Sequence, residues 1–211
     1  MSDYLLIGHP IAHSLSPLIH NKLFAYKGLS FQYKLADFGG NFTETLAFLK
    51  KAAYSSHGHG LKGFNVTIPF KEKIMGHLNE LTDRARVAGA VNTVKISDKG
   101  WIGDNTDGVG FVAGLKSRGL YLEHKSVVIL GAGGAARGIA HALCENKVSK
   151  IYICARRSEQ AAKLIGDIRR YVDPSIEWES RTLDGDLYSG DLIVNTLPQD
   201  VGRAEIGRAH V

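Results

Sequence analysis

A lysine just behind a proline is the residue of this chain that most invites a chemical explanation. Residues 63–71 read Gly-Phe-Asn-Val-Thr-Ile-Pro-Phe-Lys. Apolar and polar residues alternate as in a half-buried strand, and Pro69 suits the first position of a helix. We expect Lys71 in the first turn of a helix over 70–75, where the helix dipole disfavours an added cation. A lysine placed against that preference is a candidate proton carrier; the alternative is a solvated lysine on a surface helix.

Two serines two positions apart form a second candidate. Ser14 and Ser16 stand before Pro17, which favours the first turn of a helix over 18–26. Hydroxyls at a helix N-terminus can hold a carboxylate, because they and the backbone N–H groups donate to anions. The structural alternative is that Ser16 caps the helix and Ser14 is a loop hydroxyl.

An aspartate among small residues is the third candidate. Asp107 is followed by Gly108, and glycine lets the backbone approach a ligand closely. The structural alternative is that Asp107 caps a helix over 109–118.

A glycine-rich turn between an apolar strand and a helix predicts a dinucleotide site. The strand over 125–130 runs into Gly131-Ala132-Gly133-Gly134-Ala135, and a helix over 135–146 and a strand over 150–155 follow. In such a βαβ unit the glycines bind the pyrophosphate of a dinucleotide. Ala136 stands where a small residue permits close packing of the helix on the strand.

The residues after the second strand indicate which dinucleotide. An NAD site has an acidic residue there, which binds the ribose 2′-hydroxyl. This chain has Arg156, Arg157 and Ser158 instead. Because guanidinium groups bind phosphate oxygens in bidentate fashion, the pattern favours the 2′-phosphate of NADP.

The elements around these residues predict an α/β protein: an N-terminal α/β substrate domain followed by a Rossmann-type NADP-binding domain that is incomplete at its C-terminus. We expect a substrate-binding and catalytic domain over 1–108, a linking helix and loop over 109–124, and a partial Rossmann domain over 125–204. The other predicted elements are strands over 1–8, 31–36, 176–178 and 191–196, helices over 42–53 (capped near Asn41 or Thr43), 74–81 and 82–89, and a hairpin of 90–96 with 101–105.

Composition narrows the functional classes. The net charge of +5 over 211 residues comes from scattered basic residues without a basic run, so small anionic ligands are favoured over nucleic acid. No apolar run reaches the roughly 18 residues of a membrane span, and no signal peptide is evident, so we expect a cytoplasmic protein. Cys144 and Cys154 are expected to be core thiols, and His57 and His59 exposed loop residues rather than metal ligands.

Five segments in order resemble shikimate dehydrogenase. They are Gly8-x-Pro10-Ile11-x-His13-Ser14-x-Ser16-Pro17, Asn65-Val66-Thr67-x-Pro69-x-Lys71, Gly89-Ala90-x-Asn92-Thr93, Asn105-Thr106-Asp107-Gly108 and Gly131-Ala132-Gly133-Gly134-Ala135. Each is weak alone, whereas five in register are specific. The resemblance runs from about Tyr4 to Pro198.

The resemblance implies reversible NADPH-dependent reduction of 3-dehydroshikimate to shikimate in aromatic amino-acid (chorismate) biosynthesis, with no metal. It places the catalytic pair on Lys71, as proton donor, and Asp107, which would bind substrate and orient the lysine. It implies that Ser14 and Ser16 hold the substrate carboxylate and that Thr67 and Asn92 bind substrate polar groups. Lys71 is thereby favoured as a proton carrier over a solvated surface lysine.

Two alternatives stay open: a quinate/shikimate dehydrogenase of broader substrate and cofactor use, and a non-catalytic metabolite-binding relative. A homodimer is also left open. Residues 205–211 show no strand or helix pattern and match a reading frame of a sequencing adapter. We expect this tail to be non-native and the chain to be truncated near Ala204, so that it lacks the family's C-terminal glutamine and has uncertain activity of its own.

Overall fold

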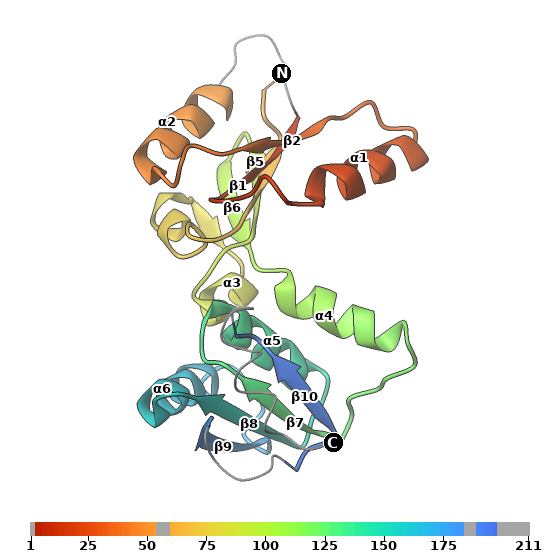
Figure 1. The fold of residues 1–211 in the computed structure, drawn as a ribbon, viewed down its shortest axis with the longest axis vertical. Helices are drawn as coiled ribbons and strands as arrows, with labels where there is room; N and C mark the ends of the chain where they lie inside the picture. The colour runs from red at the N-terminus through yellow and green to blue at the C-terminus, as the bar shows by residue number, and fades with distance from the viewer. Residues whose placement is uncertain (1–2, 54–59, 184–188, 198–211) are drawn as a thin grey trace. The chain divides into compact units, whose positions relative to one another are not determined.

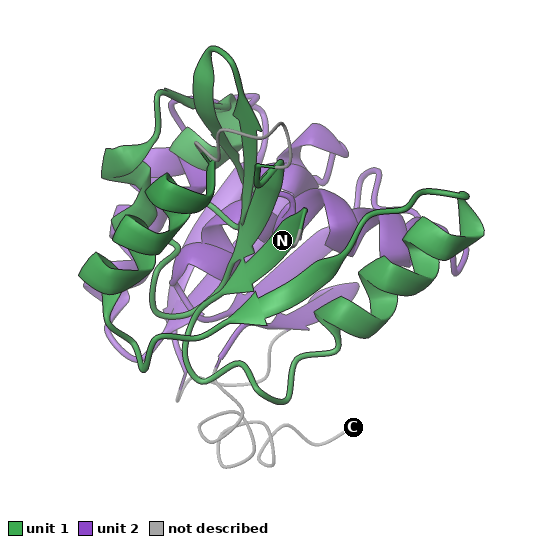
Figure 2. Ribbon diagram, turned by 90° about the horizontal axis from the view of Figure 1, so that it is seen from above, with its two compact units in different colours: residues 1–86, 90–105 green, residues 87–89, 106–211 purple. Residues whose placement is uncertain are grey.

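The computed structural model describes residues 3–53, 60–183 and 189–197. The chain divides into two compact units, which Figure 2 colours separately. Unit 1 comprises residues 1–86 and 90–105, and unit 2 comprises residues 87–89 and 106–211. The functional assignment of residues 1–108 and 125–204 as substrate and cofactor domains stays a prediction.

Unit 1 is built on a mixed six-stranded sheet of order β2-β1-β3-β5-β6-β4. β1, β2 and β3 are parallel, β5 runs antiparallel to both β3 and β6, and β4 is parallel to β6. The strands are β1 (Tyr4–Ile7), β2 (Tyr33–Ala36), β3 (Gly63–Val66), β4 (Glu80–Leu81), β5 (Thr93–Ser97) and β6 (Gly100–Asp104). β5 and β6 confirm the predicted hairpin.

Unit 1 also carries α1 (Ser16–Tyr26), α2 (Phe42–Ala53), the 3-10 helix η1 (Lys73–His77) and the start of α3 (Asp83–Ala88). The cap of α2 is as predicted, since Asn41 Oδ1 accepts the Glu44 N–H at 3.1 Å. The predicted helix over 74–81 is wrong, because the segment forms η1 and then the short strand β4. Asn79 breaks it: its side chain and backbone both bond to Trp101 of β6, which pulls the chain into the sheet.

The core of unit 1 lies between the sheet and its helices. Ile7, Phe64 and Val66 point from β1 and β3 into this core, and Phe70 and Ile74 reach it from the loop after β3. Burial of such side chains contributes about 1.5–3 kcal/mol each, so the core fixes the ends of β1 and β3 where the candidate residues follow.

Unit 2 is a parallel α/β layer (Figure 1). Its sheet has the order β10-β7-β8-β9, with β7 (Ser126–Leu130), β8 (Lys150–Ala155), β9 (Glu177–Thr182) and β10 (Leu192–Asn195). The helices are α4 (Asp107–Lys116), α5 (Gly134–Glu145) and α6 (Ser158–Ile168). The βαβ unit β7-α5-β8 is as predicted.

The larger of the two buried clusters of unit 2 lies on one face of this sheet. Val127 and Ile129 of β7 pack there with apolar residues of α5 and α6. Cys144 and Cys154 are buried and form no disulfide, which confirms them as core thiols, and burial raises the pKa of the Cys144 thiol to about 12. The mixed and parallel sheets confirm the predicted α/β class.

Candidate active site

The two serines lie in the loop that leads from β1 into α1. The Ser14 hydroxyl donates to Ser16 Oγ at 3.1 Å, and the Ser16 N–H donates to Ser14 Oγ at 3.2 Å. Ser16 is the first residue of α1, and the preceding Leu15 occupies the cap position without a side-chain bond. The capping role considered for Ser16 is therefore wrong, because Leu15 takes the cap position and the Ser16 hydroxyl accepts a hydrogen bond from Ser14.

The segment after β3 folds into a turn rather than a helix. Thr67 follows the strand, its N–H donating to the Ile7 carbonyl at 2.9 Å, and its own carbonyl accepts the Phe70 N–H at 3.0 Å. Lys71 lies in this turn, ahead of η1. The predicted helix over 70–75 is therefore wrong, and the dipole argument for Lys71 does not apply.

Two features hold the backbone of Lys71 in place. Phe70 beside it is 1% exposed and packs its ring 5.3 Å from that of Phe42. The Lys71 carbonyl accepts the Val91 N–H at 2.8 Å, and Lys71 itself is half-buried. The lysine thus stands next to the segment that carries Asn92.

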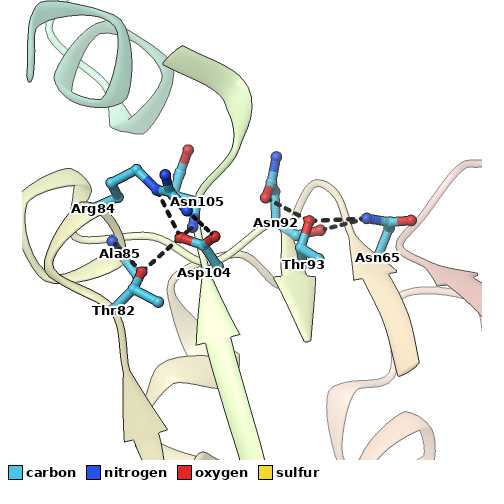
Figure 3. Close-up of polar contacts among 8 residues, drawn as sticks. All are labelled: Asn65, Thr82, Arg84, Ala85, Asn92, Thr93, Asp104 and Asn105. Atoms are coloured by element: carbon cyan, nitrogen blue, oxygen red, sulfur yellow. Dashed lines mark hydrogen bonds and ion pairs between the residues drawn. The ribbon is translucent and has the colours of Figure 1, made fainter. Parts of the chain in front are cut away.

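The backbone of Asn92 is fixed between two strands. Its N–H donates to the Asp104 carbonyl at 3.1 Å, and its carbonyl accepts the Val66 N–H at 2.8 Å. The side chain is oriented by Thr93, whose hydroxyl donates to Asn92 Oδ1 at 2.9 Å. The Asn92 Nδ2 end points away from Thr93 (Figure 3), which sets it as a donor of hydrogen bonds.

Hydrogen bonds to the Asp104 carboxylate secure the end of β6, beside the segment that carries Asn92. Asp104 accepts hydrogen bonds from Thr82 Oγ1 at 2.6 Å and from Arg84 Nη2 at 2.6 Å (Figure 3). Burial alone would raise the pKa of Asp104, but hydrogen bonds from Arg84 and Thr82 outweigh it and leave the pKa below its ordinary value. Asp104 also receives the Asn105 N–H at 2.8 Å, so the start of the Asn105-Thr106-Asp107-Gly108 motif is anchored.

Asp107 opens α4 in unit 2. Thr106 holds the cap position, so Asp107 is the first helical residue rather than the cap. The next residue, Gly108, packs closely against α5, where an added Cβ would collide with the carbonyl of Gly138. Asp107 is half-buried.

The glycine-rich turn leads from β7 into α5. Gly131 has a φ of 112°, a conformation that favours glycine, and an added Cβ would collide with Thr196 Oγ1. Gly133 precedes the first turn of α5, and a Cβ on it would meet open space. Ala136 is fully buried against the sheet, as predicted. Gly133 and the exposed Ala135 thus border an accessible helix N-terminus, where backbone N–H groups favour phosphate.

Arg156, Arg157 and Ser158 follow β8 and open α6. All three are exposed; Arg157 takes the cap position and Ser158 is the first helical residue. Two guanidinium groups at the start of a helix suit an anion such as a phosphate.

Within residues 3–53, 60–183 and 189–197, no group of three or more His, Cys, Asp or Glu could hold a metal ion. None of the helices that the structure describes is long and apolar enough to span a bilayer. His57, His59 and the tail 205–211 lie outside the described residues.

Sequence reasoning missed the role of Tyr33 and the whole of α6. Tyr33 is 3% exposed, and its hydroxyl is bonded within the unit. The signal for Tyr33 was a phenol in a strand position that is buried, since a buried phenol hydroxyl needs a hydrogen-bond partner. The apolar spacing of Ala161, Leu164, Ile165 and Ile168 was the signal for α6.

Comparisons with known proteins agree on one family. Residues 6–94 match the family model described as shikimate dehydrogenase substrate binding domain, and residues 115–182 match the model described as shikimate / quinate 5-dehydrogenase. The shikimate dehydrogenase (NADP(+)) of Oceanobacillus iheyensis is 41% identical over 196 residues, covering 90% of this chain and 67% of that protein. That of Xanthomonas campestris is 43% identical over 199 residues, covering 92% and 66%.

A solved structure agrees as well. The shikimate 5-dehydrogenase of Thermus thermophilus, in complex with NADP(H) and shikimate, superposes with a TM-score of 0.79 at 30% identity, covering 93% of this chain and 69% of that one. The chain thus spans about two thirds of the length of its relatives.

Proposed function

The chain belongs to the shikimate dehydrogenase family, and from this premise we propose that it supports reversible NADPH-dependent reduction of 3-dehydroshikimate to shikimate. Relatives with this name and a structure that holds both NADP(H) and shikimate support the proposal. Its place is the shikimate pathway, which leads to chorismate and the aromatic amino acids.

The observation that carries the proposal is the setting of Lys71. Its backbone is held by Val91 next to Asn92, and its side chain is half-buried. An ammonium group positioned in this way gives a proton to the substrate carbonyl oxygen during reduction, and the resulting amine takes the proton back from the hydroxyl during oxidation. Asp107 hydrogen-bonds the substrate and orients Lys71; the family resemblance supports this role.

Four polar residues of unit 1 bind the substrate in this proposal. Ser14 and Ser16 hold the carboxylate, supported by their placement at the start of α1, where the helix dipole favours an anion. Thr67 and Asn92 bind hydroxyl or carbonyl oxygens. The orientation of Asn92, with its oxygen committed to Thr93, makes it a donor to such an oxygen.

Unit 2 fits a dinucleotide with a 2′-phosphate. Gly131, Ala132, Gly133, Gly134 and Ala135 supply the turn and the helix N-terminus for the pyrophosphate, and Gly133 leaves the space that close approach requires. Arg156, Arg157 and Ser158 bind the 2′-phosphate. NADPH, when bound, supplies the hydride that reduces the substrate carbonyl.

The relatives' names and single residues of the chain support further parts of the proposal. The names of the relatives favour shikimate over quinate, and NADP over NAD. The presence of both Lys71 and Asp107 favours an enzyme over a non-catalytic relative. The two buried cysteines, Cys144 and Cys154, form no disulfide, which agrees with a reducing cytoplasm. That the protein binds no nucleic acid stays a prediction, and so does the formation of a homodimer.

The test is a four-way assay of shikimate and quinate oxidation, each with NADP and with NAD, followed by the absorbance of the reduced cofactor. The proposal predicts the highest kcat/KM for shikimate with NADP. A preference for quinate, or equal use of NAD, would support the broader relative. Absence of any turnover, together with absence of shikimate binding by calorimetry, would contradict the proposal.

A further inference from the structure

One asparagine of unit 1 stands in the middle of an apolar strand. Asn65 is the third residue of β3, and its neighbours Phe64 and Val66 are both 2% exposed. Asparagine is depleted in strands, and its side chain needs hydrogen-bond partners when it is partly buried. Asn65 belongs to one of the five segments that resemble the family, but the proposed function gives it no role. A residue that opposes the local preference of a strand is a candidate for function.

The partners of the Asn65 side chain determine which way its amide points. Nδ2 lies 3.2 Å from the backbone carbonyl of Asn92, which can only accept, so the NH2 end of the amide is on this side. The oxygen end accepts the phenol O–H of Tyr33 at 2.7 Å. Both ends of the amide are thus assigned by the chemistry of their partners.

Asn65 also donates to Thr93, the residue directly opposite it in β5. The register pairs the two residues, and Asn65 Nδ2 donates to Thr93 Oγ1 at 3.0 Å (Figure 3). Because an amide NH2 group does not accept hydrogen bonds, Thr93 cannot return its own proton to Asn65. The Thr93 hydroxyl donates instead to Asn92 Oδ1 at 2.9 Å. Asn65 therefore directs the proton that holds the side-chain oxygen of Asn92.

The backbone of Asn92 is held by the same side chain. The Asn92 carbonyl accepts the Val66 N–H at 2.8 Å in addition to Asn65 Nδ2. A carbonyl oxygen has two lone pairs, so residues of β3 occupy both. Asn65 thus acts on Asn92 at two points, directly at the backbone carbonyl and through Thr93 at the side-chain oxygen.

We propose that Asn65 is a positioning residue, which holds Asn92 so that the NH2 end of the Asn92 amide faces the substrate. The inference rests on the proposed function, which assigns Asn92 to substrate oxygens. Without the Asn65 amide, the Thr93 hydroxyl is able to accept from Asn92 instead of donating to it. Asn92 would then turn its oxygen outward and offer the substrate an acceptor in place of a donor.

The experiment is a double-mutant cycle on the full chain, with the dissociation constant of shikimate, measured by calorimetry, as the readout. Asn65→Leu removes the amide and keeps the approximate size of the side chain. In the wild type it should weaken shikimate binding about fivefold, the effect of losing about one net hydrogen bond. In the Asn92→Ala background, which lacks the amide that Asn65 positions, the further loss should be less than about twofold. In the Ser16→Ala background the loss should again be about fivefold, since Ser16 binds another part of the substrate.

Tyr33→Phe is the matched control. It removes the hydrogen bond at the oxygen end of the Asn65 amide and leaves the bonds from Nδ2 to Asn92 and Thr93, which hold the amide as before. It should change shikimate affinity by less than about twofold. If Asn65→Leu alone does not fold, as judged by thermal unfolding, the cycle is repeated with Asn65→Leu combined with Tyr33→Phe. Replacing both partners of a hydrogen bond by apolar groups of similar shape costs little stability.

The outcomes separate this inference from the proposed function. Equal losses from Asn65→Leu in the wild-type and Asn92→Ala backgrounds would overturn the positioning role, because Asn65 would then act independently of Asn92. Unchanged affinity of Asn65→Leu in the wild type would overturn it as well. Both results leave the proposed function standing. Failure of the wild-type chain to bind shikimate would overturn the proposed function and this inference with it.

Discussion

The hydroxyl of Thr93 donates a 2.9 Å hydrogen bond to the side-chain oxygen of its neighbour Asn92. Adjacent residues in a strand point to opposite faces, but Asn92 precedes β5, so the two side chains can meet. This one bond decides which end of the Asn92 amide is presented as a donor. It links the local fold to the proposed chemistry.

Thr93→Val should weaken shikimate binding about fivefold, the effect of losing one net hydrogen bond of about 1 kcal/mol. The change keeps the shape of the side chain but removes the group that orients Asn92. Thr93→Ser, which keeps the hydroxyl, should bind shikimate as the wild type does. Calorimetric titration measures both, and equal affinity of the valine and serine variants would contradict the orienting role.

Arg156→Ala should raise the KM for NADP about tenfold or more, because a charge-assisted hydrogen bond contributes about 1.5–3 kcal/mol. The KM for NAD should change little, since NAD has no 2′-phosphate. Arg170→Ala is the control: Arg170 is also exposed but follows α6 rather than opening it. Equal effects of Arg156→Ala on both cofactors would remove the 2′-phosphate assignment.

The glycine turn allows a matched pair of alanine substitutions. Gly131→Ala should destabilise the protein by about 1–2 kcal/mol or more, since a φ of 112° is unfavourable for alanine and its Cβ would collide with Thr196. Gly133→Ala should leave stability within about 0.5 kcal/mol, because its Cβ meets open space. It should nevertheless weaken NADP binding, as the Cβ occupies the approach to the helix N-terminus.

Thermal unfolding and NADP titration measure these two effects. Unchanged NADP affinity in Gly133→Ala would show that the pyrophosphate does not approach this turn. Unchanged stability in Gly131→Ala would contradict the backbone argument.

The sequence predicted those features of the fold whose signals are local. The turn from Gly131 to Ala135 and the hairpin around Asp98 are each determined by residues close together in the chain. The setting of Lys71 was wrongly predicted, because the turn after Thr67 is held by the burial of Phe70 and by a bond to Val91, 20 positions away (91 − 71). No local pattern carries that information.

The candidate site was predictable to the same extent. Motifs identified Ser14, Ser16 and Asn92 one by one. The hydrogen bonds behind Asn92 could not be foreseen, because the Tyr33–Asn65 bond joins residues 32 positions apart, and only the register of β1 with β2 and β3 brings these two residues together. Pairing across a sheet depends on the whole fold.

Acid should destabilise unit 2 through Asp191. Hydrogen bonds from the Ser126 backbone, from Lys125 and from the Ser126 hydroxyl lower the pKa of Asp191 to about 2, and tie the start of β10 to that of β7. The unfolded chain, with an Asp pKa of about 3.9, therefore binds a proton first as pH falls. The stabilisation is complete above about pH 5 and is lost as pH falls toward 2.

Asp191→Asn tests this dependence. The wild type should melt at a higher temperature than the variant at neutral pH, and the difference should shrink between about pH 5 and pH 2. A difference that is constant over this range would show that ionisation of Asp191 does not stabilise the fold.

The proton-carrier role of Lys71 is tested most directly by the turnover of shikimate with NADP in Lys71→Ala, compared with Lys73→Ala. Lys73 lies two positions on, in η1, and is exposed. Lys71→Ala should lower kcat by about 10²–10⁴-fold, the usual contribution of a proton-transfer group, while shikimate binding stays largely intact. Lys73→Ala should turn over as the wild type does. Normal turnover by Lys71→Ala would contradict the assignment of Lys71 as the proton carrier.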